Sequence, residues 1–548
     1  MKLTTSWLKP PYASSGIDHL GTQAPCVMIY GQLLPGITNV TDRARYYSFY
    51  PWLVWSYDQR YAKDDYNHFV ERFRRADCLF TLIAERHAQA TDHKNERHGV
   101  AMVGRTKLVP SLTSLKAGEP LRLSLYATTR ETPQRYFMNR LGGLSQYYAG
   151  TLADLQLMES SGRSWSSYSS QYGAPLAQSV ELSVPGDRFW EVVENDSVTL
   201  DELDEMSSFC ACNIPGSQGE LQQLADIFFD ADNRYSEEGA QRRRSLGLIQ
   251  QLADTLANGW DLTEEVFRGC VYSAALPNGE AWEIPDALQA TRAHWAVYVR
   301  NDLMSVAFQT ILAICLQELQ PQSAAQRRVF HSVEAFADWF SGSETVARVV
   351  SDLGAASFDD LVTSSRANAP ELTDWTNEAH EIQLSWQLIG GWAPGVNIAP
   401  LLSQSLSLLA MLAARDDLEQ QPYSGLAITS EALRDYPINL ISFRSRNADW
   451  KTMPLEHVVA DLVIWCLDTH LRVALRKLRQ SNRSTFHLRP SERGLEVVGD
   501  QIPPPSSTTP RFRQAVQILR DLGMLERDES HMIRLTASGR KRMEVASV

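Results

Sequence analysis

The feature that most constrains the fold is one unbroken helical segment near the middle of the chain, bounded by Pro285 and Pro321. Its apolar and aromatic side chains recur at helical spacing over about 35 residues, a length that makes it a spine for its surroundings. Nearly every segment between 200 and 388 has the same helical character, with acidic residues at the helix starts. The sequence therefore predicts a mainly α protein with a multi-helix body.

Composition indicates a soluble globular protein with more than one domain. The chain has 548 residues, of which 44% are hydrophobic and 21% are charged, proportions that suit a large buried core. The N-terminus has no long apolar stretch, and the apolar runs at 304–316 and 401–414 are too short for a membrane span. Seven scattered cysteines fit a reducing compartment. We therefore expect a cytoplasmic protein without a membrane segment.

Charge is distributed unevenly along the chain, which suggests three regions. Residues 471–548 hold 15 Lys and Arg against 8 Asp and Glu, a net charge of +7, whereas the other 470 residues hold 37 against 57, a net charge of −20. An acidic body repels a phosphate backbone and a basic end attracts one. We expect a mixed, aromatic-rich helical domain at 1–165, an all-helical body at 166–480, and a basic connector with a small module at 481–548. The Pro-rich stretch 501–510 predicts a stiff, extended connector.

The first hundred residues predict loops followed by two helices. Residues 1–40 are rich in Pro, Gly and Ser and indicate loops with a single strand at 26–30. The aromatic run at 43–55 has the spacing of a buried helical stripe, although aromatic residues beside basic ones can also stack bases. A second helix is expected at 64–90, with His87 on its apolar face. Six basic residues of this and a later helix are expected to be solvated: Arg72, Arg74, Arg75, Arg242, Arg243 and Arg244.

No motif in the sequence identifies a catalytic activity. The stretch 99–106 approaches a phosphate-binding loop, but it has Arg105 where that motif needs a lysine. Cys210 and Cys212 are the one close cysteine pair, and no histidine stands at zinc spacing from them. The densest set of other possible ligands is better explained as a hydrated turn: Glu85, His87, Asp92, His93, Glu96 and His98. We therefore expect no catalytic residues, no metal and no cofactor, and a protein indifferent to chelators.

The last forty residues carry the clearest local pattern. Apolar residues at 512–522 are spaced three and four apart, which predicts a helix with one buried face. Thr509 is the expected N-cap, Pro510 suits the first helical position, and Gly523 suits the residue just past the end. A short strand, a turn, a second strand and a last helix capped by Thr536 are expected to follow.

This order of helix, two-stranded wing and helix, with the pattern Leu535-Thr-x-x-Gly539, resembles the later half of a winged-helix domain. The resemblance implies that one helix enters the major groove and the wing follows the DNA backbone. It also implies supporting helices, and we expect the helix at 455–478 to supply part of that support. The side chains expected to contact DNA are Arg511, Arg513, Gln517, Arg520, Arg534, Arg540 and Lys541.

The run GITNVTDRARYYSFYPW at 36–52 is similar to segments in large proteins of bacterial multigene antiphage islands, of the Druantia-like kind. That resemblance implies a non-catalytic subunit that works beside a helicase or nuclease. With the C-terminal module, it leads us to expect a DNA-associated scaffold or adaptor in a bacterial antiphage defence complex, without enzymatic activity of its own. Two alternatives stay open: a divergent metal-dependent nuclease or phosphohydrolase using the 87–98 region, and a transcriptional regulator.

Overall fold

Helices make up most of the structure, which confirms the expected mainly α fold. The computed structural model describes residues 18–40, 43–61, 65–91, 102–159, 167–320, 328–415, 421–481, 484–499 and 501–546. Each sheet within these residues consists of two short antiparallel strands. These pairs are too small to form a layer of the fold, so helix packing supplies the core.

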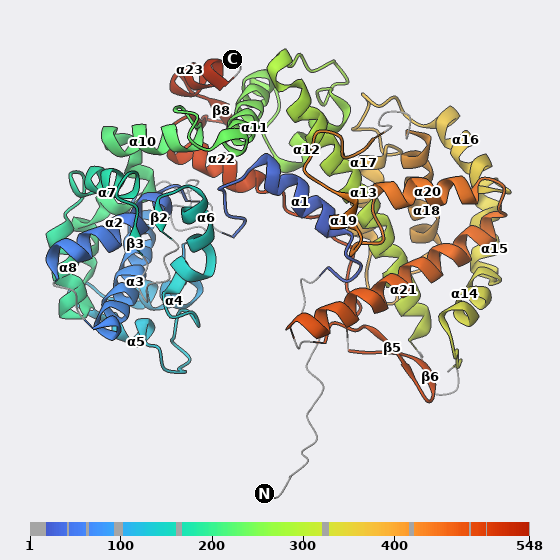
Figure 1. Ribbon diagram of the computed structural model, residues 1–548, viewed down its shortest axis with the longest axis horizontal. Coiled ribbons are helices and arrows are strands. Elements are labelled where there is room, and N and C mark those ends of the chain that lie inside the picture. The colour runs from blue at the N-terminus through green and yellow to red at the C-terminus, as the bar shows by residue number, and fades with distance from the viewer. Residues whose placement is uncertain are drawn as a thin grey trace, which may run out of the picture. The chain divides into compact units, whose positions relative to one another are not determined.

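Two compact units make up the chain, and each is assembled from separate stretches of sequence. Unit 1 comprises 1–32, 265–284 and 292–508, and unit 2 comprises 33–264, 285–291 and 509–548. This division does not follow the three regions expected from charge and composition. The last forty residues pack with the N-terminal half of the chain instead of forming a module by themselves. Figure 1 shows the helices and strands of both units.

Unit 2 is built from short helices around two long ones. The expected helix at 64–90 is confirmed as α3, and β1 pairs with β4 while β2 pairs with β3. The elements that precede its C-terminal stretch are α2 (Arg45–Arg60), α3 (Tyr66–Ala90), α4 (Arg105–Ser114), β1 (Leu121–Arg122), α5 (Ser124–Ala127), η1 (Leu144–Tyr148), α6 (Ala149–Asp154), β2 (Met158–Glu159), β3 (Ser167–Tyr168), α7 (Gly173–Glu181), α8 (Gly186–Asn195), β4 (Ser197–Val198), α9 (Leu200–Glu205), η2 (Ser207–Phe209), η3 (Ala211–Gly216), α10 (Gln218–Phe228), α11 (Ser236–Thr255) and η4 (Leu256–Asn258).

Helix α2 forms the aromatic core of unit 2. All of its rings except the half-buried Trp55 are buried, and Phe49 stacks on Phe80 of α3 with the ring centroids 3.9 Å apart. Arg45 is buried with them and pairs with Glu220 at 3.0 Å. The aromatic run at 43–55 is therefore core up to Trp52, as its helical spacing favoured, and these buried rings are not available to stack bases.

Two arginines expected to be solvated are instead buried in unit 2. Arg74 donates hydrogen bonds to the main-chain carbonyl oxygens of Ala127, Thr128, Phe137, Asn139 and Arg140. Arg242 donates to those of Pro35, Ile227 and Phe228. The expectation was wrong for both, because a guanidinium with five N–H donors can satisfy loop carbonyls that no helix or sheet pairs. The other four arginines keep partly exposed side chains: Arg72, Arg75, Arg243 and Arg244.

Unit 1 contains the long helices expected at 285–321 and 455–478, which are confirmed as α13 and α21. The strand expected at 26–30 is wrong: those residues belong to α1, and a five-residue apolar run does not reveal its period. The elements that lie wholly or mostly in unit 1 are α1 (Gln23–Leu33), α12 (Glu264–Ser273), α13 (Asp286–Leu319), α14 (Val333–Ser341), α15 (Glu344–Leu353), α16 (Phe358–Asn368), α17 (Glu381–Gly391), α18 (Ile398–Ala414), α19 (Ser430–Leu433), α20 (Leu440–Trp450), α21 (Leu455–Ser481), β5 (Leu488–Ser491) and β6 (Gly494–Val497).

Helix α13 is long and apolar enough to cross a bilayer, and it is the one such helix among the residues that the structure describes. However, 83% of its most apolar 18-residue window is buried inside the structure. Its apolar surface is thus covered by protein, and α13 serves as the core helix of unit 1.

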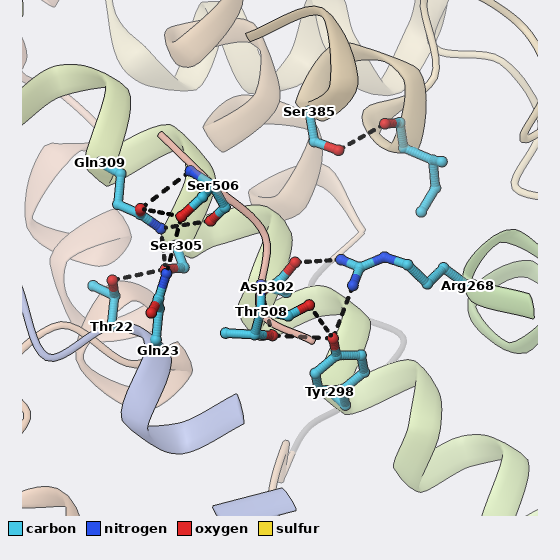
Figure 2. A network of polar contacts seen from close by, with 11 residues as sticks. Thr22, Gln23, Arg268, Tyr298, Asp302, Ser305, Gln309, Ser385, Ser506 and Thr508 are labelled. Carbon is cyan, nitrogen blue, oxygen red and sulfur yellow. Dashed lines mark hydrogen bonds and ion pairs between the residues drawn. The ribbon is translucent and has the colours of Figure 1, made fainter. Parts of the chain in front are cut away.

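The connector expected at 501–510 is extended, and its residues 506–508 are fastened to α13 within unit 1. Figure 2 shows Ser506 exchanging hydrogen bonds with Gln309 at 3.0 and 3.2 Å. Two residues on, Thr508 donates its main-chain N–H and its hydroxyl to Asp302, at 2.8 and 2.7 Å. Arg268 of α12 pairs with the same carboxylate. The stretch is therefore a bound strap rather than a free spacer.

Candidate functional site

The C-terminal stretch of unit 2 folds into helix, hairpin and helix: α22 (Phe512–Asp521), β7 (Leu525–Arg527), β8 (Ile533–Leu535) and α23 (Ala537–Ala546). Gly523 follows α22 with a φ of +66°, and the Thr536 hydroxyl accepts the N–H of Gly539 at 3.0 Å, as expected. The expected start of α22 is wrong. Arg511 precedes the helix with a φ of +59°, so the chain turns there and leaves Thr509 and Pro510 outside the helix.

The helices that support this stretch are not the ones expected. Helix α11 packs against both α23 and β8 (Figure 1), and η3 packs against α22. Two long-range hydrogen bonds fix the arrangement: Gln250 donates to the Gly539 carbonyl at 3.1 Å, and the Ile533 N–H donates to Asp261 at 2.7 Å. The expected supporter, α21, lies in unit 1. The support therefore comes from the middle of the sequence.

Most of the α22 surface is buried within unit 2. Of the three side chains on this helix that are expected to contact DNA, Arg513 is exposed, whereas Gln517 and Arg520 are half-buried. Arg520 donates to Gln517 at 3.0 Å, and Gln517 donates to Asp521 at 2.9 Å. Asp521 is buried and accepts two hydrogen bonds from Arg43, at 3.0 and 2.9 Å. Two of the three side chains on α22 that are expected to contact DNA thus make hydrogen bonds within unit 2.

The other side chains expected to contact DNA are likewise either engaged within the fold or exposed. Arg511 donates to the Leu34 carbonyl at 2.8 Å, and Arg534 pairs with Asp528 at 3.0 Å while donating to the Trp260 carbonyl. Arg540 pairs with Asp254 at 2.6 Å but keeps 54% of its side chain exposed. Lys541 is exposed. A further exposed arginine, Arg527 on the hairpin, was not among the expected contacts.

The charge asymmetry seen along the sequence disappears when charges are counted by structural unit. Unit 2 holds 31 Lys and Arg against 37 Asp and Glu, a net charge of −6, and unit 1 holds 21 against 28, a net charge of −7. The basic C-terminal region is shared between the two units, so its positive charge is set among acidic neighbours. Any attraction for a polyanion is therefore local to a few exposed side chains.

Three metal-ligating side chains from distant parts of the sequence meet in unit 2. His87 lies in the last turn of α3, Cys210 lies between η2 and η3, and Cys212 is the second residue of η3. The Cys212 Sγ lies 3.4 Å from the His87 Nδ1 and 3.4 Å from the Cys210 Sγ. All three ligating atoms lie within 4.8 Å of one another. The histidine partner that the sequence lacked at zinc spacing is supplied by the fold.

The backbone around these three side chains is well fixed. The His87 carbonyl accepts the Thr91 N–H at 3.0 Å and the Thr91 hydroxyl at 2.6 Å, which closes the end of α3. The Cys210 N–H donates to the Ser207 carbonyl at 2.9 Å, and the Cys210 carbonyl accepts the Asn213 N–H at 3.0 Å. The hydrogen bond with Cys210 raises the pKa of His87, although burial acts in the opposite direction. Hydrogen bonding to Cys210 and burial together raise the pKa of Cys212.

Sequence reasoning had named every member of this cluster but never joined them. His87 was grouped with four residues that lie outside the described ones: Asp92, His93, Glu96 and His98. Glu85, the last member of that group, pairs with Arg105 at 2.5 Å instead. The signal that could have connected the cysteines to α3 was the position of His87 on the apolar face, which had to pack against another segment.

A second histidine cluster lies in unit 1 and has a different character. The His19 and His487 rings are 4.4 Å apart between centroids, and His470 lies about equally far from each, at 6.1 and 6.0 Å. His470 accepts the His487 N–H on Nε2 at 3.0 Å, so its Nδ1 carries the proton and donates to the His19 carbonyl at 3.1 Å. Main-chain groups thus use both nitrogens of His470, which marks a packing role.

No protein-family model, no curated protein and no solved structure matches the chain at a significant level.

Proposed function

We propose that the chain is a DNA-associated adaptor of the bacterial cytoplasm that performs no chemistry of its own and works as one subunit of a multi-protein antiphage assembly. One observation carries the DNA contact. The last forty residues form the helix, hairpin and helix that the winged-helix resemblance calls for, and four of their basic side chains are largely exposed: Arg513, Arg527, Arg540 and Lys541.

The proposed DNA contact uses only the start of α22 and not the whole length of a recognition helix. Arg513 lies in the first turn of α22, and the N-terminal residues of such helices are the ones that approach DNA. Gln517 and Arg520 lie farther along the helix and are engaged within unit 2. DNA would therefore meet the start of α22, the hairpin and α23, and a few phosphate contacts would dominate its affinity.

Salt-dependent binding tests the proposal. The double variant Arg513→Glu with Lys541→Glu is compared with Lys116→Glu with Arg130→Glu, which makes the same charge change at exposed positions elsewhere in unit 2. Each phosphate contact contributes about −0.9 to the slope of log affinity against log salt, so the first variant should make the slope shallower by about two. Fluorescence anisotropy with a DNA duplex measures both. Equal losses in the two variants would reduce the effect to overall charge and remove the proposed interface.

The adaptor role is tested by co-expression with the neighbouring genes. A helicase or nuclease subunit that co-purifies with the chain would support it. Turnover of DNA or nucleotide by the isolated chain, abolished by His87→Ala, would instead support the metal-dependent nuclease or phosphohydrolase. The donor set around His87 does not favour that alternative, because phosphoryl-transfer metals such as Mg²⁺ take oxygen ligands rather than thiolates.

A further inference from the structure

We propose that His87, Cys210 and Cys212 bind a zinc ion that ties the end of α3 to the turn carrying the two cysteines. This site is independent of the proposed DNA contact. Imidazole and two thiolates are a donor set that selects zinc over the hard cations, and sets of this kind hold zinc with three protein ligands.

The distances fit the ion without rearrangement of the backbone. Zinc–sulfur and zinc–nitrogen bonds of about 2.3 and 2.0 Å in a tetrahedron place two sulfurs roughly 3.8 Å apart and a sulfur and a nitrogen roughly 3.6 Å apart. The observed separations of Cys212 Sγ from Cys210 Sγ and from His87 Nδ1 are both 3.4 Å. A shift of a few tenths of an ångström in the side chains would open the space for the ion. On binding, the thiols lose their protons to solvent, so affinity rises with pH.

Burial sets both the stability of the site and its access. Cys210 is fully buried, whereas His87 and Cys212 are half-buried, so the ion is reached from the side of Cys212. Three protein ligands leave the fourth tetrahedral position to a water molecule or to a side chain from a partner. The ligands come from rigid elements, because hydrogen bonds close the turn at Cys210 and the end of α3 at His87.

The position of the turn gives the ion a structural task. The 3₁₀ helix η3 begins directly after Cys210, includes Cys212 and packs against α22, with its Pro215 beside Gly523. A bound ion would therefore fasten to α3 the segment on which α22 rests. Its loss would weaken unit 2 without removing any residue of the proposed DNA contact.

Metal titration of the reduced full-length chain tests the site. After chelation and removal of the chelator, Co²⁺ should bind with one equivalent per chain and give a thiolate-to-cobalt charge-transfer band that Zn²⁺ abolishes. Cys212→Ser should weaken Zn²⁺ affinity by more than the roughly 10–100-fold that loss of an outer partner costs. His68→Ala, an exposed histidine on the same helix α3, is the matched control and should bind like the wild type.

Thiol protection supplies a readout that needs no variant. Cys212 is the only one of the seven cysteines that is not buried, so it should be alkylated first in the folded chain, and Zn²⁺ should protect it. Absence of cobalt binding by the reduced chain, or alkylation of Cys212 at the same rate with and without Zn²⁺, would overturn the proposal. So would a Cys210–Cys212 disulfide that persists in the presence of reductant and Zn²⁺.

Discussion

The C-terminal helix–hairpin–helix and the His87–Cys210–Cys212 cluster differ in how far the sequence alone could predict them. The first is contiguous in sequence, and apart from the start of α22 its elements lie where their spacing and caps predict. Yet much of its expected contact surface is engaged inside unit 2, where Gln517 and Arg520 bond along α22. The second is spread over more than a hundred residues, and only folding assembles it. Local periodicity thus predicts a helix or a strand. Whether its side chains are exposed for binding depends on which other segments pack against it.

The largest expected effect comes from the buried carboxylate that fixes α22. Asp521 accepts two hydrogen bonds from Arg43 and a third from the Ala44 N–H at 2.9 Å, and both charged side chains are buried. Asp521→Ala should lower the free energy of unfolding by about 3–5 kcal/mol, because it removes the carboxylate that pairs with the buried Arg43 charge. Urea denaturation measures this, with Glu526→Ala on the exposed hairpin as the control. A loss below about 1 kcal/mol would mean that α22 is docked loosely and its inner face is available after all.

The second effect separates a histidine that packs from one that can bind a metal. Burial lowers the pKa of His470 to about 4. The hydrogen bond with the His19 carbonyl opposes this shift, and the positive charges of His487 and Lys477 add to it. The unfolded histidine titrates near 6.5, so the unfolded state binds more protons between about pH 6.5 and 4. Stability should therefore fall on acidification, by up to about 1.4 kcal/mol per pH unit for this residue. His470→Gln should flatten the urea-midpoint profile in that window, whereas an unchanged profile would contradict the buried neutral state.

The third effect concerns the cap that closes the hairpin onto α23. The Thr536 hydroxyl accepts the Gly539 N–H at 3.0 Å and donates to the Gly523 carbonyl at 2.8 Å. Thr536→Ala should cost about 1 kcal/mol, and Thr536→Ser should restore most of it. Thermal unfolding of both variants checks the order. If alanine and serine cost the same, the methyl group of Thr536 would matter more than its hydrogen bonds.

Some parts of this structure could be predicted from the sequence and others could not. Hydrophobic period, glycine and threonine located α3, α13, α21 and the C-terminal elements, because each signal lies within a few residues of its effect. The start of α22 was not predicted, because Arg511 adopts a left-handed backbone conformation that is uncommon for residues other than glycine. The buried roles of Arg74 and Arg242 were missed because loop carbonyls leave no pattern in the sequence.

The smallest effect decides whether the C-terminal surface works as proposed. Arg513 and Arg520 lie on the same helix seven residues apart, and both carry one positive charge. Arg513 is exposed in the first turn, whereas Arg520 is half-buried and donates to Gln517. Arg513→Ala should change stability by less than about 0.5 kcal/mol but make the salt slope of DNA binding shallower by about 0.9. Arg520→Ala should leave that slope unchanged, because its side chain is already engaged. Anisotropy titrations at several salt concentrations measure both variants, and a larger slope change for Arg520→Ala would show that α22 turns its inner face to DNA.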